Sequence, residues 1–301
     1  MKAWLPFADA AQQLGEVPPG VDIDVYDGEG AEPASIDDVE FYVLPYTGGP
    51  HTVDIAARMP RLQIMQTLTA GVDHVLGQVP DGVTLCNARG VHDASTAELA
   101  LTLMLAALRQ VPEFVRAQQR AEWVVESTPA LADKSVLIVG YGSIGAAVEH
   151  RLAGFEVTLL RVARSSRDGV AGLDELPDLL PQADVVVLTV PLSTQTRGMV
   201  DAAFLARMRD GALLVNVARG AVVDTDALLD ELSTGRLQAA LDVTDPEPLP
   251  ADHPLWRAPG LLLTPHVGGN TSAFLPRALR LVREQLRRHV AGEPLANIVD
   301  T

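Results

Sequence analysis

The sequence predicts an α/β fold made of two Rossmann-like or flavodoxin-like parallel-sheet domains, one inserted into the other. Short apolar runs alternate with helix-like stretches along nearly the whole chain of 301 residues, which is typical of parallel sheets covered by helices. A glycine-rich turn opens the second set of runs, and a long helix-like stretch stands on each side of that set. We therefore expect an inserted domain over residues 94–274 and a discontinuous domain formed by residues 1–93 and 275–301.

The first third of the chain contains five apolar runs of strand length. Loops rich in glycine and proline follow several of these runs, and such loops end strands and redirect the chain. The expected strands span residues 2–5, 22–26, 41–44, 62–67 and 83–87.

A long helix is predicted to begin after Asp93, since Ser95 and Glu98 have the spacing of a capping box. Residues 100–108 are apolar nearly all round, so this helix should be buried on several sides, either in the core or in a dimer interface. A last, amphipathic helix over residues 272–290 should end near Gly292. Between these helices we expect six strands, over residues 135–140, 157–162, 185–190, 212–217, 239–243 and 261–264.

The composition argues against several classes of function. A net charge of -16 disfavours nucleic-acid binding, which needs a basic surface. Cys86 is the only cysteine and lies in an apolar run, so we expect a buried, unreactive thiol and no disulfide. No two of the seven histidines are three or four residues apart, and we predict no metal site. The N-terminus has no signal-peptide pattern and no apolar run could span a membrane, so we expect a cytoplasmic protein without membrane partners.

The glycine-rich turn is expected to bind a dinucleotide. Gly140, Gly142 and Gly145 follow an apolar run and precede a helix-like stretch, the order that strand, turn and helix have in dinucleotide-binding proteins. The glycines permit a tight turn and close approach of the backbone to a pyrophosphate. Ser143 and Ile144 begin the helix, whose N-terminal N–H groups would bind the phosphates.

The segment after the next strand favours NADP(H), with NAD(H) possible. NAD-binding proteins place an Asp or Glu about 20 residues into the motif to bind the ribose 2′-hydroxyl. Ala163 occupies that position, and the next carboxylate along the chain is Asp168. Arg164 and Ser165 could instead bind a 2′-phosphate by charge-assisted hydrogen bonds. The alternative is that the arginines of this segment are only solvated side chains of a surface loop and bind no ligand.

Three loops after later strands carry a cation, a carboxylate and a histidine. Arg219, Glu247 and His266 each follow an apolar run, and ligands of open α/β sheets bind beyond the carboxyl ends of the strands. Taken singly, each has a structural interpretation: a surface ion pair, a solvated loop charge or a core histidine. Together, downstream of a dinucleotide turn, they fit the reduction of a 2-oxo acid, which needs a cation for the carboxylate and an acid for the forming alkoxide.

These motifs resemble those of the D-isomer-specific 2-hydroxyacid dehydrogenase family along essentially the whole chain, in particular its NADP-type glyoxylate and hydroxypyruvate reductases. The glycine turn, Asn-Val-Ala-Arg-Gly over residues 216–220, Glu-Pro-Leu-Pro over 247–250 and Thr-Pro-His-Val-Gly-Gly over 264–269 stand in the family's order and spacing. The resemblance implies a homodimer that packs through its nucleotide domains.

The resemblance also implies a role for each site residue. Arg219 would bind the substrate carboxylate and polarise its carbonyl, His266 would transfer the proton, and Glu247 would orient His266 and favour its charged form. Residues 69–74 resemble the family's substrate loop, in which backbone N–H groups, here those of Ala70 and Gly71, hold the substrate beside Arg219 and His266. Asp242 would support the geometry of the site. Besides the glycine turn, Arg164 and Ser165, the residues expected at the cofactor are Val190, Pro191, Thr196, Val217, Ala218, Asp242 and Gly268.

A small acid such as glyoxylate, hydroxypyruvate or pyruvate is the expected substrate. The 46–49 loop has no positive charge, which disfavours a phosphorylated substrate. Family members that oxidise formate have a glutamine where this chain has Glu247, so the resemblance disfavours formate.

Two other functions stay open on the same fold. One is a dinucleotide-sensing, corepressor-like binding protein, since relatives with such roles can retain the Arg, Glu and His. The other is a phosphite dehydrogenase, which phosphite-dependent reduction of NAD(P) would reveal. A serine nucleophile has no support, because no Gly-x-Ser-x-Gly motif occurs.

Overall fold

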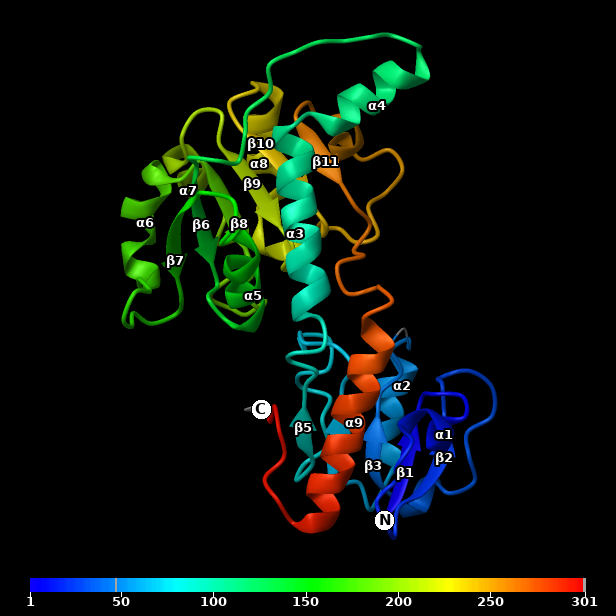
Figure 1. The fold of residues 1–301 in the computed structure, drawn as a ribbon. Helices are drawn as coiled ribbons and strands as arrows, with labels where there is room; N and C mark the ends of the chain where they lie inside the picture. The colour runs from blue at the N-terminus through cyan, green and yellow to red at the C-terminus, as the bar shows by residue number, and fades with distance from the viewer. Residues whose placement is uncertain (47, 300–301) are drawn as a thin grey trace. The chain divides into compact units, whose positions relative to one another are not determined.

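The computed structural model describes residues 1–46 and 48–299, so Thr47 of the 46–49 loop lies outside the described residues. The chain forms two compact units, Met1–His92 with Ser272–Thr301, and Asp93–Thr271. Each unit contains one sheet, and every pair of neighbouring strands is parallel (Figure 1). The prediction of a two-domain α/β fold with parallel sheets is confirmed.

The first unit has five strands in the order β2-β1-β3-β4-β5. Successive residues of β1 are buried in different apolar clusters: Leu5 packs with Val282 of the last helix, whereas Trp4 packs with Tyr42 in the second cluster. The C-terminal helix therefore completes the core of the N-terminal sheet. The elements are β1 (Lys2–Leu5), α1 (Ala10–Leu14), β2 (Asp22–Val25), η1 (Ile36–Asp38), β3 (Val39–Val43), α2 (His51–Asp54), η2 (Ile55–Arg58), β4 (Ile64–Gln66), β5 (Thr84–Cys86) and α9 (Phe274–Ala291).

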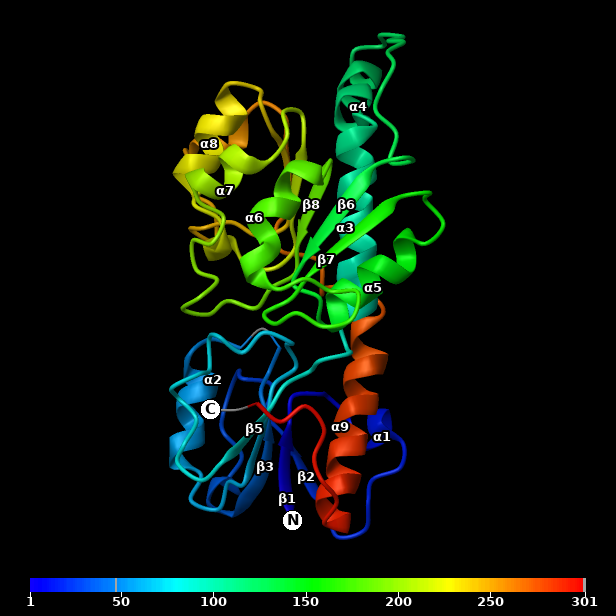
Figure 2. The same ribbon diagram turned by 90° about the vertical axis from the view of Figure 1, so that its left-hand side faces the viewer.

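The second unit has six strands in the order β11-β10-β9-β8-β6-β7. Helices α3 and α5 cover one face and α6, α7 and α8 the other (Figure 2), because alternate residues of each strand point to opposite faces. The strand order reverses at β6, which pairs with both β7 and β8, and ligands of such sheets bind at this switch point. The elements are α3 (Asp93–Leu108), α4 (Val111–Gln119), β6 (Ser135–Val139), α5 (Ser143–Leu152), β7 (Thr158–Val162), η3 (Leu173–Glu175), α6 (Leu176–Leu179), η4 (Leu180–Gln182), β8 (Val185–Leu188), α7 (Ala202–Arg207), β9 (Leu213–Asn216), η5 (Gly220–Val222), α8 (Thr225–Ser233), β10 (Gln238–Leu241), η6 (Pro254–Arg257) and β11 (Leu261–Leu263).

The predicted capping box at Ser95 is wrong. Helix α3 already begins at Asp93, and Ser95 lies within its first turn and is buried. A cap residue has non-helical backbone angles, which Ser95 does not have, and the carboxylate of Asp93 stands instead at the positive end of the helix dipole. Several strands also end earlier than expected; β8, for example, ends at Leu188 because the chain turns there into a loop of the second unit.

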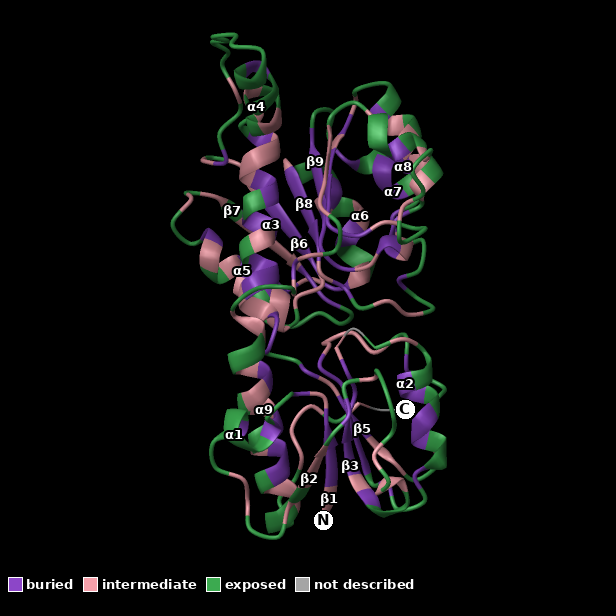
Figure 3. Cartoon of the chain, turned by 90° about the vertical axis from the view of Figure 1, so that its right-hand side faces the viewer, coloured by how far each residue is buried: buried purple, intermediate pink, exposed green. Residues whose placement is uncertain are grey.

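Most strand residues are buried, as Figure 3 shows. All four residues of both β8 and β9 are buried. Cys86 is buried at the end of β5, as expected, and burial raises the pKa of its thiol to about 11. Within residues 1–46 and 48–299, no helix is long and apolar enough to cross a membrane.

Candidate active site

The glycine turn joins β6 to α5, and two of its three glycines have no room for a side chain. A Cβ on Gly140, whose φ is 104°, would lie 2.6 Å from the Thr189 carbonyl carbon, and a Cβ on Gly145 would lie 2.5 Å from the Gly140 oxygen. Nothing lies within 4 Å of a Cβ built on Gly142. Gly140 and Gly145 therefore serve the packing of the protein itself, whereas Gly142 leaves open space where a pyrophosphate could approach the backbone.

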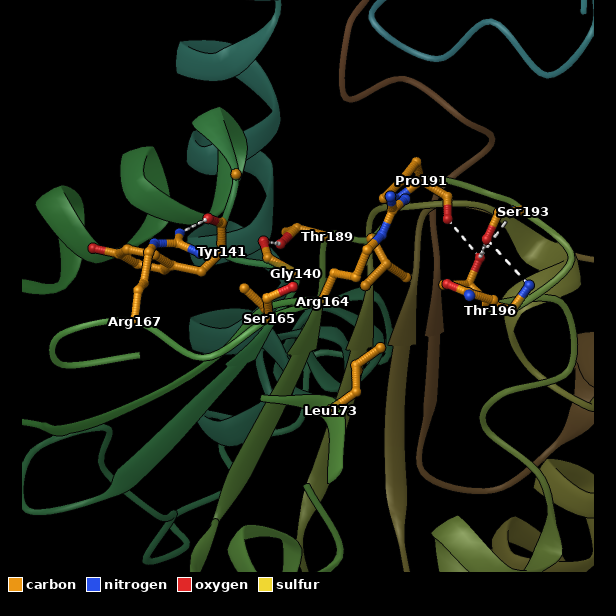
Figure 4. Close-up of a pocket in the computed structure, with 14 residues that line it drawn as sticks. Gly140, Tyr141, Arg164, Ser165, Arg167, Leu173, Thr189, Pro191, Ser193 and Thr196 are labelled. Carbon is orange, nitrogen blue, oxygen red and sulfur yellow. Dashed lines mark hydrogen bonds between the residues drawn. The ribbon is translucent and has the colours of Figure 1, made fainter. Parts of the chain in front are cut away.

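A cavity of about 330 Å³ lies beside this turn. Its walls come from the turn after β6, the segment after β7 and the loop after β8 (Figure 4). The described residues that line it include Arg164 and Arg167 but no carboxylate, so the cavity is locally positive in a chain of net charge -16. The lining residues are Gly140, Tyr141, Gly142, Ala163, Arg164, Ser165, Arg167, Leu173, Thr189, Val190, Pro191, Ser193, Gln195 and Thr196.

Arg164 and Ser165, predicted from the sequence to face a 2′-phosphate, both line this cavity. Arg164 is exposed and extends toward Pro191 in Figure 4. Its guanidinium forms no hydrogen bond or ion pair with the described part of the chain, which leaves all of its donors for a ligand. Ala163 stands where NAD-binding proteins carry an acid and is 9% exposed, so the wall contains nothing that would repel a phosphate there.

The loop after β8 holds its shape through its own side chains. The Thr196 hydroxyl donates to the Pro191 carbonyl at 2.6 Å and accepts the Ser193 N–H at 2.9 Å. The Thr189 hydroxyl donates to the Gly140 carbonyl at 2.6 Å and so ties this loop to the glycine turn. The loop is therefore a firm wall of the cavity.

Other residues expected at the cofactor lie outside this cavity. Ser143, at the start of α5, donates to Asp93 at 3.2 Å. Val217 and Ala218 follow β9 and are 7% exposed, within the two apolar clusters on opposite faces of the sheet. Ile144 and Gly145 begin α5 and also pack against the core, while Gly268 lies on the loop after β11.

Glu247 and His266 come together from the loops that follow the neighbouring strands β10 and β11. Glu247 Oε1 and His266 Nδ1 form a hydrogen bond. Since a carboxylate oxygen accepts, Nδ1 is the donor and Nε2 is the nitrogen left for a substrate. The Glu247 side chain is 40% exposed and the His266 side chain is 45% exposed. The hydrogen bond therefore orients the imidazole, and the ring stays accessible to a ligand.

Asp242 fixes the loop that carries His266. Its side chain is buried, accepts the Thr264 hydroxyl at 2.6 Å, and accepts the N–H groups of Val267 and Gly268 at 2.9 Å each. Its main-chain carbonyl accepts the His266 N–H at 2.7 Å. His266 itself has φ 54°, a left-handed conformation that is uncommon for a residue other than glycine and that these contacts stabilise.

Arg219 follows β9 and is half-buried. The Asn216 side chain donates to the Arg219 carbonyl at 3.0 Å, and the Arg219 guanidinium donates to the Ala218 carbonyl at 2.8 Å. The next residue, Gly220, has no room for a side chain, because a Cβ there would lie 1.9 Å from the Thr244 oxygen. The backbone that carries Arg219 thus touches the loop that leads to Glu247.

The predicted substrate loop belongs to the first unit. Two carbonyls of this loop accept hydrogen bonds from side chains of the same unit. The Thr69 hydroxyl donates to the Gly71 carbonyl at 2.7 Å, and the Asn87 amide donates to the Ala70 carbonyl at 3.1 Å. The N–H groups of Ala70, Gly71 and Val72 have no acceptor in the described part of the chain. These three donors suit a carboxylate.

Sequence reasoning missed Tyr141, Arg167, Leu173, Thr189, Ser193 and Gln195 as cavity residues. The only available signal was position: Tyr141 stands inside the glycine motif and Arg167 stands three residues after Arg164. In the structure the Arg167 guanidinium donates to the Tyr141 carbonyl at 2.7 Å, a contact that no spacing rule predicts.

Comparison with known proteins places this geometry in a family. Residues 101–268 match the NAD binding domain of the D-isomer specific 2-hydroxyacid dehydrogenases. The chain is 33% identical over 265 residues to a glyoxylate reductase of Korarchaeum cryptofilum, which covers 83% of this chain and 80% of that protein. A solved D-isomer specific 2-hydroxyacid dehydrogenase from Xanthobacter autotrophicus, in complex with NADPH and MES, has a TM-score of 0.85 at 32% identity, covering 99% of this chain and 97% of that one.

A second kind of relative is longer than this chain. The D-3-phosphoglycerate dehydrogenase of Methanocaldococcus jannaschii is 32% identical over 267 residues, which is 84% of this chain. This chain spans only about half of that relative, 50% of its length.

Proposed function

The chain belongs to the D-isomer specific 2-hydroxyacid dehydrogenase family, and from this premise we propose that it interconverts a small 2-oxo acid and its D-2-hydroxy acid with NADP(H). The observation that carries the proposal is the His266–Glu247 hydrogen bond, in the same unit as a glycine turn and a basic cavity. When bound, the dinucleotide supplies or accepts the hydride at C2 of the substrate.

His266 is the proposed acid and base. Because Nδ1 donates its hydrogen bond to Glu247, Nε2 is the nitrogen left for the substrate. During reduction Nε2 gives its proton to the substrate oxygen, and during oxidation it receives the proton back. The negative charge of Glu247 stabilises the imidazolium, which is the form that reduction consumes. Glu247 also fixes the orientation of the ring, so little reorganisation is needed when the proton moves.

Arg219 is the proposed cation at the substrate. A guanidinium can donate two parallel hydrogen bonds to a carboxylate, and it can polarise an adjacent carbonyl. Ala70 and Gly71 stay the predicted substrate-loop residues of the first unit, where their N–H groups have no acceptor in the described part of the chain. A small acid such as glyoxylate, hydroxypyruvate or pyruvate is the proposed substrate, because residues 46–49 have no positive charge that would bind a phosphate group.

NADP(H) is the proposed cofactor, with NAD(H) as the weaker alternative. The residues present fit a dinucleotide, since Gly142 leaves room for a pyrophosphate at the N-terminus of α5. The unpaired guanidinium of Arg164 and the hydroxyl of Ser165 stand on the wall where NAD-specific proteins place a carboxylate. The NADPH bound to the Xanthobacter relative supports the same choice.

Initial rates of NADPH and NADH oxidation, with glyoxylate, hydroxypyruvate, pyruvate and phenylpyruvate, test the function. We expect turnover with at least one acid, and a higher kcat/KM with NADPH. Binding of the dinucleotide without any turnover would favour a sensor protein instead. Phosphite-dependent reduction of NADP or NAD, with no activity on the acids, would favour a phosphite dehydrogenase.

The chain is also proposed to form a homodimer through its second unit. Helix α4 and the segment after it extend away from the sheet of that unit (Figure 1). They expose apolar side chains, with Trp123 at 93% and Val125 at 83%. Residues 111–126 contain two Arg and three Glu, and the pairs Arg116–Glu113 and Arg120–Glu122 neutralise each other locally. Two copies of a strongly negative chain repel least across such a neutral surface.

Light scattering after gel filtration tests the dimer. We expect the wild type at twice the chain mass and a Trp123→Asp variant mostly at the mass of one chain. A monomeric wild type would refute the dimer without affecting the proposed chemistry.

A further inference from the structure

The Asn87 side chain connects the end of β5 to the loop of residues 69–74 in the first unit. Its amide oxygen accepts the Arg89 N–H at 3.0 Å, and its Nδ2 group donates to the Ala70 carbonyl at 3.1 Å. An N–H can bond only to the oxygen of the amide, so the contact with Arg89 turns the NH2 group of Asn87 toward the loop. The two ends of the amide thus have separate partners, one in its own turn and one in the loop.

The hydrogen bond to the Ala70 carbonyl also sets the direction of a donor. A trans peptide group is planar, and its C=O and N–H point in opposite directions. Because Asn87 holds the Ala70 carbonyl, it directs the N–H of Gly71, which belongs to the same peptide group, away from Asn87. That N–H has no acceptor in the described part of the chain.

The two neighbouring peptide groups of the loop are held in the same way. The Thr69 carbonyl accepts the Thr67 hydroxyl at 2.8 Å and the Ala88 N–H at 2.9 Å. The Gly71 carbonyl accepts the Thr69 hydroxyl at 2.7 Å. Each contact directs the N–H of the residue that follows the bonded carbonyl. The loop thus has a defined backbone, although it forms neither a helix nor a strand.

The C-terminal segment holds the backbone of Asn87. The Asn87 N–H donates to the Asn297 carbonyl at 3.0 Å, and the Asn87 carbonyl accepts the Gln66 side chain at 3.0 Å. Beside it, Cys86 and Ile298 form an antiparallel bridge. The C-terminal segment therefore runs along the outer edge of β5, the last strand of its sheet.

A buried pair of amides joins this segment to α9. Gln66 and Gln285 are both 0% exposed. Gln285 Nε2 donates to Gln66 Oε1 at 2.8 Å and to the Ala296 carbonyl at 2.9 Å, and Gln285 Oε1 accepts the Ala296 N–H at 2.8 Å. Moving either amide would leave a buried polar group without its partner, which is costly. Asn87 therefore reaches the loop from a rigid support.

We propose that Asn87, held by the C-terminal segment, is a positioning residue that fixes the Ala70–Gly71 peptide group so that the Gly71 N–H can bind the carboxylate of the substrate. The inference rests on the proposed function, in which residues 69–74 are the substrate loop. A donor that is already oriented loses little conformational freedom when the ligand binds. The C-terminal segment, which contains none of the proposed catalytic residues, thereby contributes to substrate affinity.

Substitutions of Asn87, with a matched control, test this inference in the full chain. Asn87→Asp keeps the oxygen that accepts the Arg89 N–H but loses the donor to Ala70, and Asn87→Ala loses the donor without adding a charge. Asn297→Asp makes the same change in an amide that donates to the Arg89 carbonyl and not to the loop. Asn87 and Asn297 are both half-buried, so the two Asp variants differ mainly in their link to the loop.

Calorimetric titration with oxamate, in the presence of NADPH, measures both the Kd and the number of binding sites. Oxamate is a carboxylate with an amide where a 2-oxo acid has its reducible ketone, so no turnover is needed. We expect both Asn87 variants to bind oxamate at least about tenfold more weakly, the effect of one charge-assisted hydrogen bond, and Asn297→Asp to stay within about twofold of the wild type. The KM for hydroxypyruvate should rise by the same factor while kcat changes less than about twofold, because the carboxylate is bound equally in the transition state.

The outcomes separate a positioning role from a structural one. If Asn87→Ala has fewer binding sites but the wild-type Kd, Asn87 only keeps the chain folded and the inference fails. If Asn87→Asp and Asn297→Asp weaken oxamate equally, the effect is general charge repulsion, which also refutes it.

The same titrations separate the inference from the proposed function. A wild type that binds oxamate but reduces no 2-oxo acid, with weaker binding in both Asn87 variants, would keep the positioning role and overturn only the reaction. A protein that reduces a 2-oxo acid equally well with and without the Asn87 amide would keep the reaction and refute the inference.

Discussion

The backbone N–H of His266 donates to the carbonyl oxygen of Asp242 at 2.7 Å, and the Asp242 carboxylate accepts the next two N–H groups of the same loop. Asp242 follows β10 and is 3% exposed. The sheet thereby determines where the imidazole stands, although His266 itself lies on a loop. A loop residue held in this way can keep a left-handed backbone conformation that it would not adopt alone.

Replacing Asp242 with Asn should loosen that loop. An amide has one acceptor oxygen in place of two, so at least one N–H of the loop loses its partner. We expect the free energy of unfolding to fall by about 1–3 kcal/mol and kcat to fall about tenfold or more. Urea unfolding and steady-state kinetics measure both effects, and Asp252→Asn, an exposed site near Glu247, is the control. An unchanged kcat would show that Asp242 does not position His266.

Replacing Glu247 with Gln removes the charge beside His266 while an acceptor oxygen remains. The imidazolium loses its stabilising neighbour, so we expect kcat for reduction to fall by about 10²-fold, a typical contribution of an acid–base group. The Kd for NADPH, measured by fluorescence, should change less than about threefold. Equal kcat values for the variant and the wild type would contradict the role of Glu247.

The glycine turn allows a matched pair of substitutions. A Cβ on Gly142 meets nothing within 4 Å, whereas a Cβ on Gly145 would meet the Gly140 oxygen at 2.5 Å. Gly145→Ala should therefore destabilise the fold by about 1–3 kcal/mol, and Gly142→Ala should unfold like the wild type but bind NADPH more weakly. Thermal unfolding and NADPH titration distinguish the two. Wild-type affinity in Gly142→Ala would mean that no ligand approaches that face of the turn.

Cys86 should resist thiol reagents in the folded protein. Burial raises the pKa of its thiol to about 11, against an ordinary value of 9.0. Reactivity depends on the thiolate, whose fraction at pH 8 is about 100-fold lower at the raised pKa. We expect alkylation at pH 8 to be at least that much slower than in urea, and to rise as the pH approaches 11. Rapid labelling of the native protein would contradict the burial of Cys86.

The sequence predicted the sheets and the main loops because buried parallel strands appear as continuous apolar runs. Glu247 and His266 were expected together since each follows a late strand, and those strands prove to be the neighbours β10 and β11. The apolar runs in the sequence do not specify the order of the strands in the sheet. It follows from packing of the whole sheet.

The wrong predictions came from local sequence patterns that are compatible with more than one structure. Ser95 and Glu98 have capping-box spacing, but the same spacing also occurs inside a helix, and α3 begins at Asp93. Tyr141 was overlooked because its orientation depends on Arg161 and Glu149, which come from other elements. Contacts of this kind arise only when distant segments meet.

The most direct test of the proposed chemistry compares the wild type with His266→Ala in single-turnover reduction of hydroxypyruvate or glyoxylate, with NADPH binding measured on the same samples. We predict that the variant binds NADPH with wild-type affinity while its rate of hydride transfer falls by at least about 10²-fold, as expected when an acid–base group is removed. A variant that transfers hydride at the wild-type rate would contradict the assignment of His266, and with it the catalytic role of its bond to Glu247.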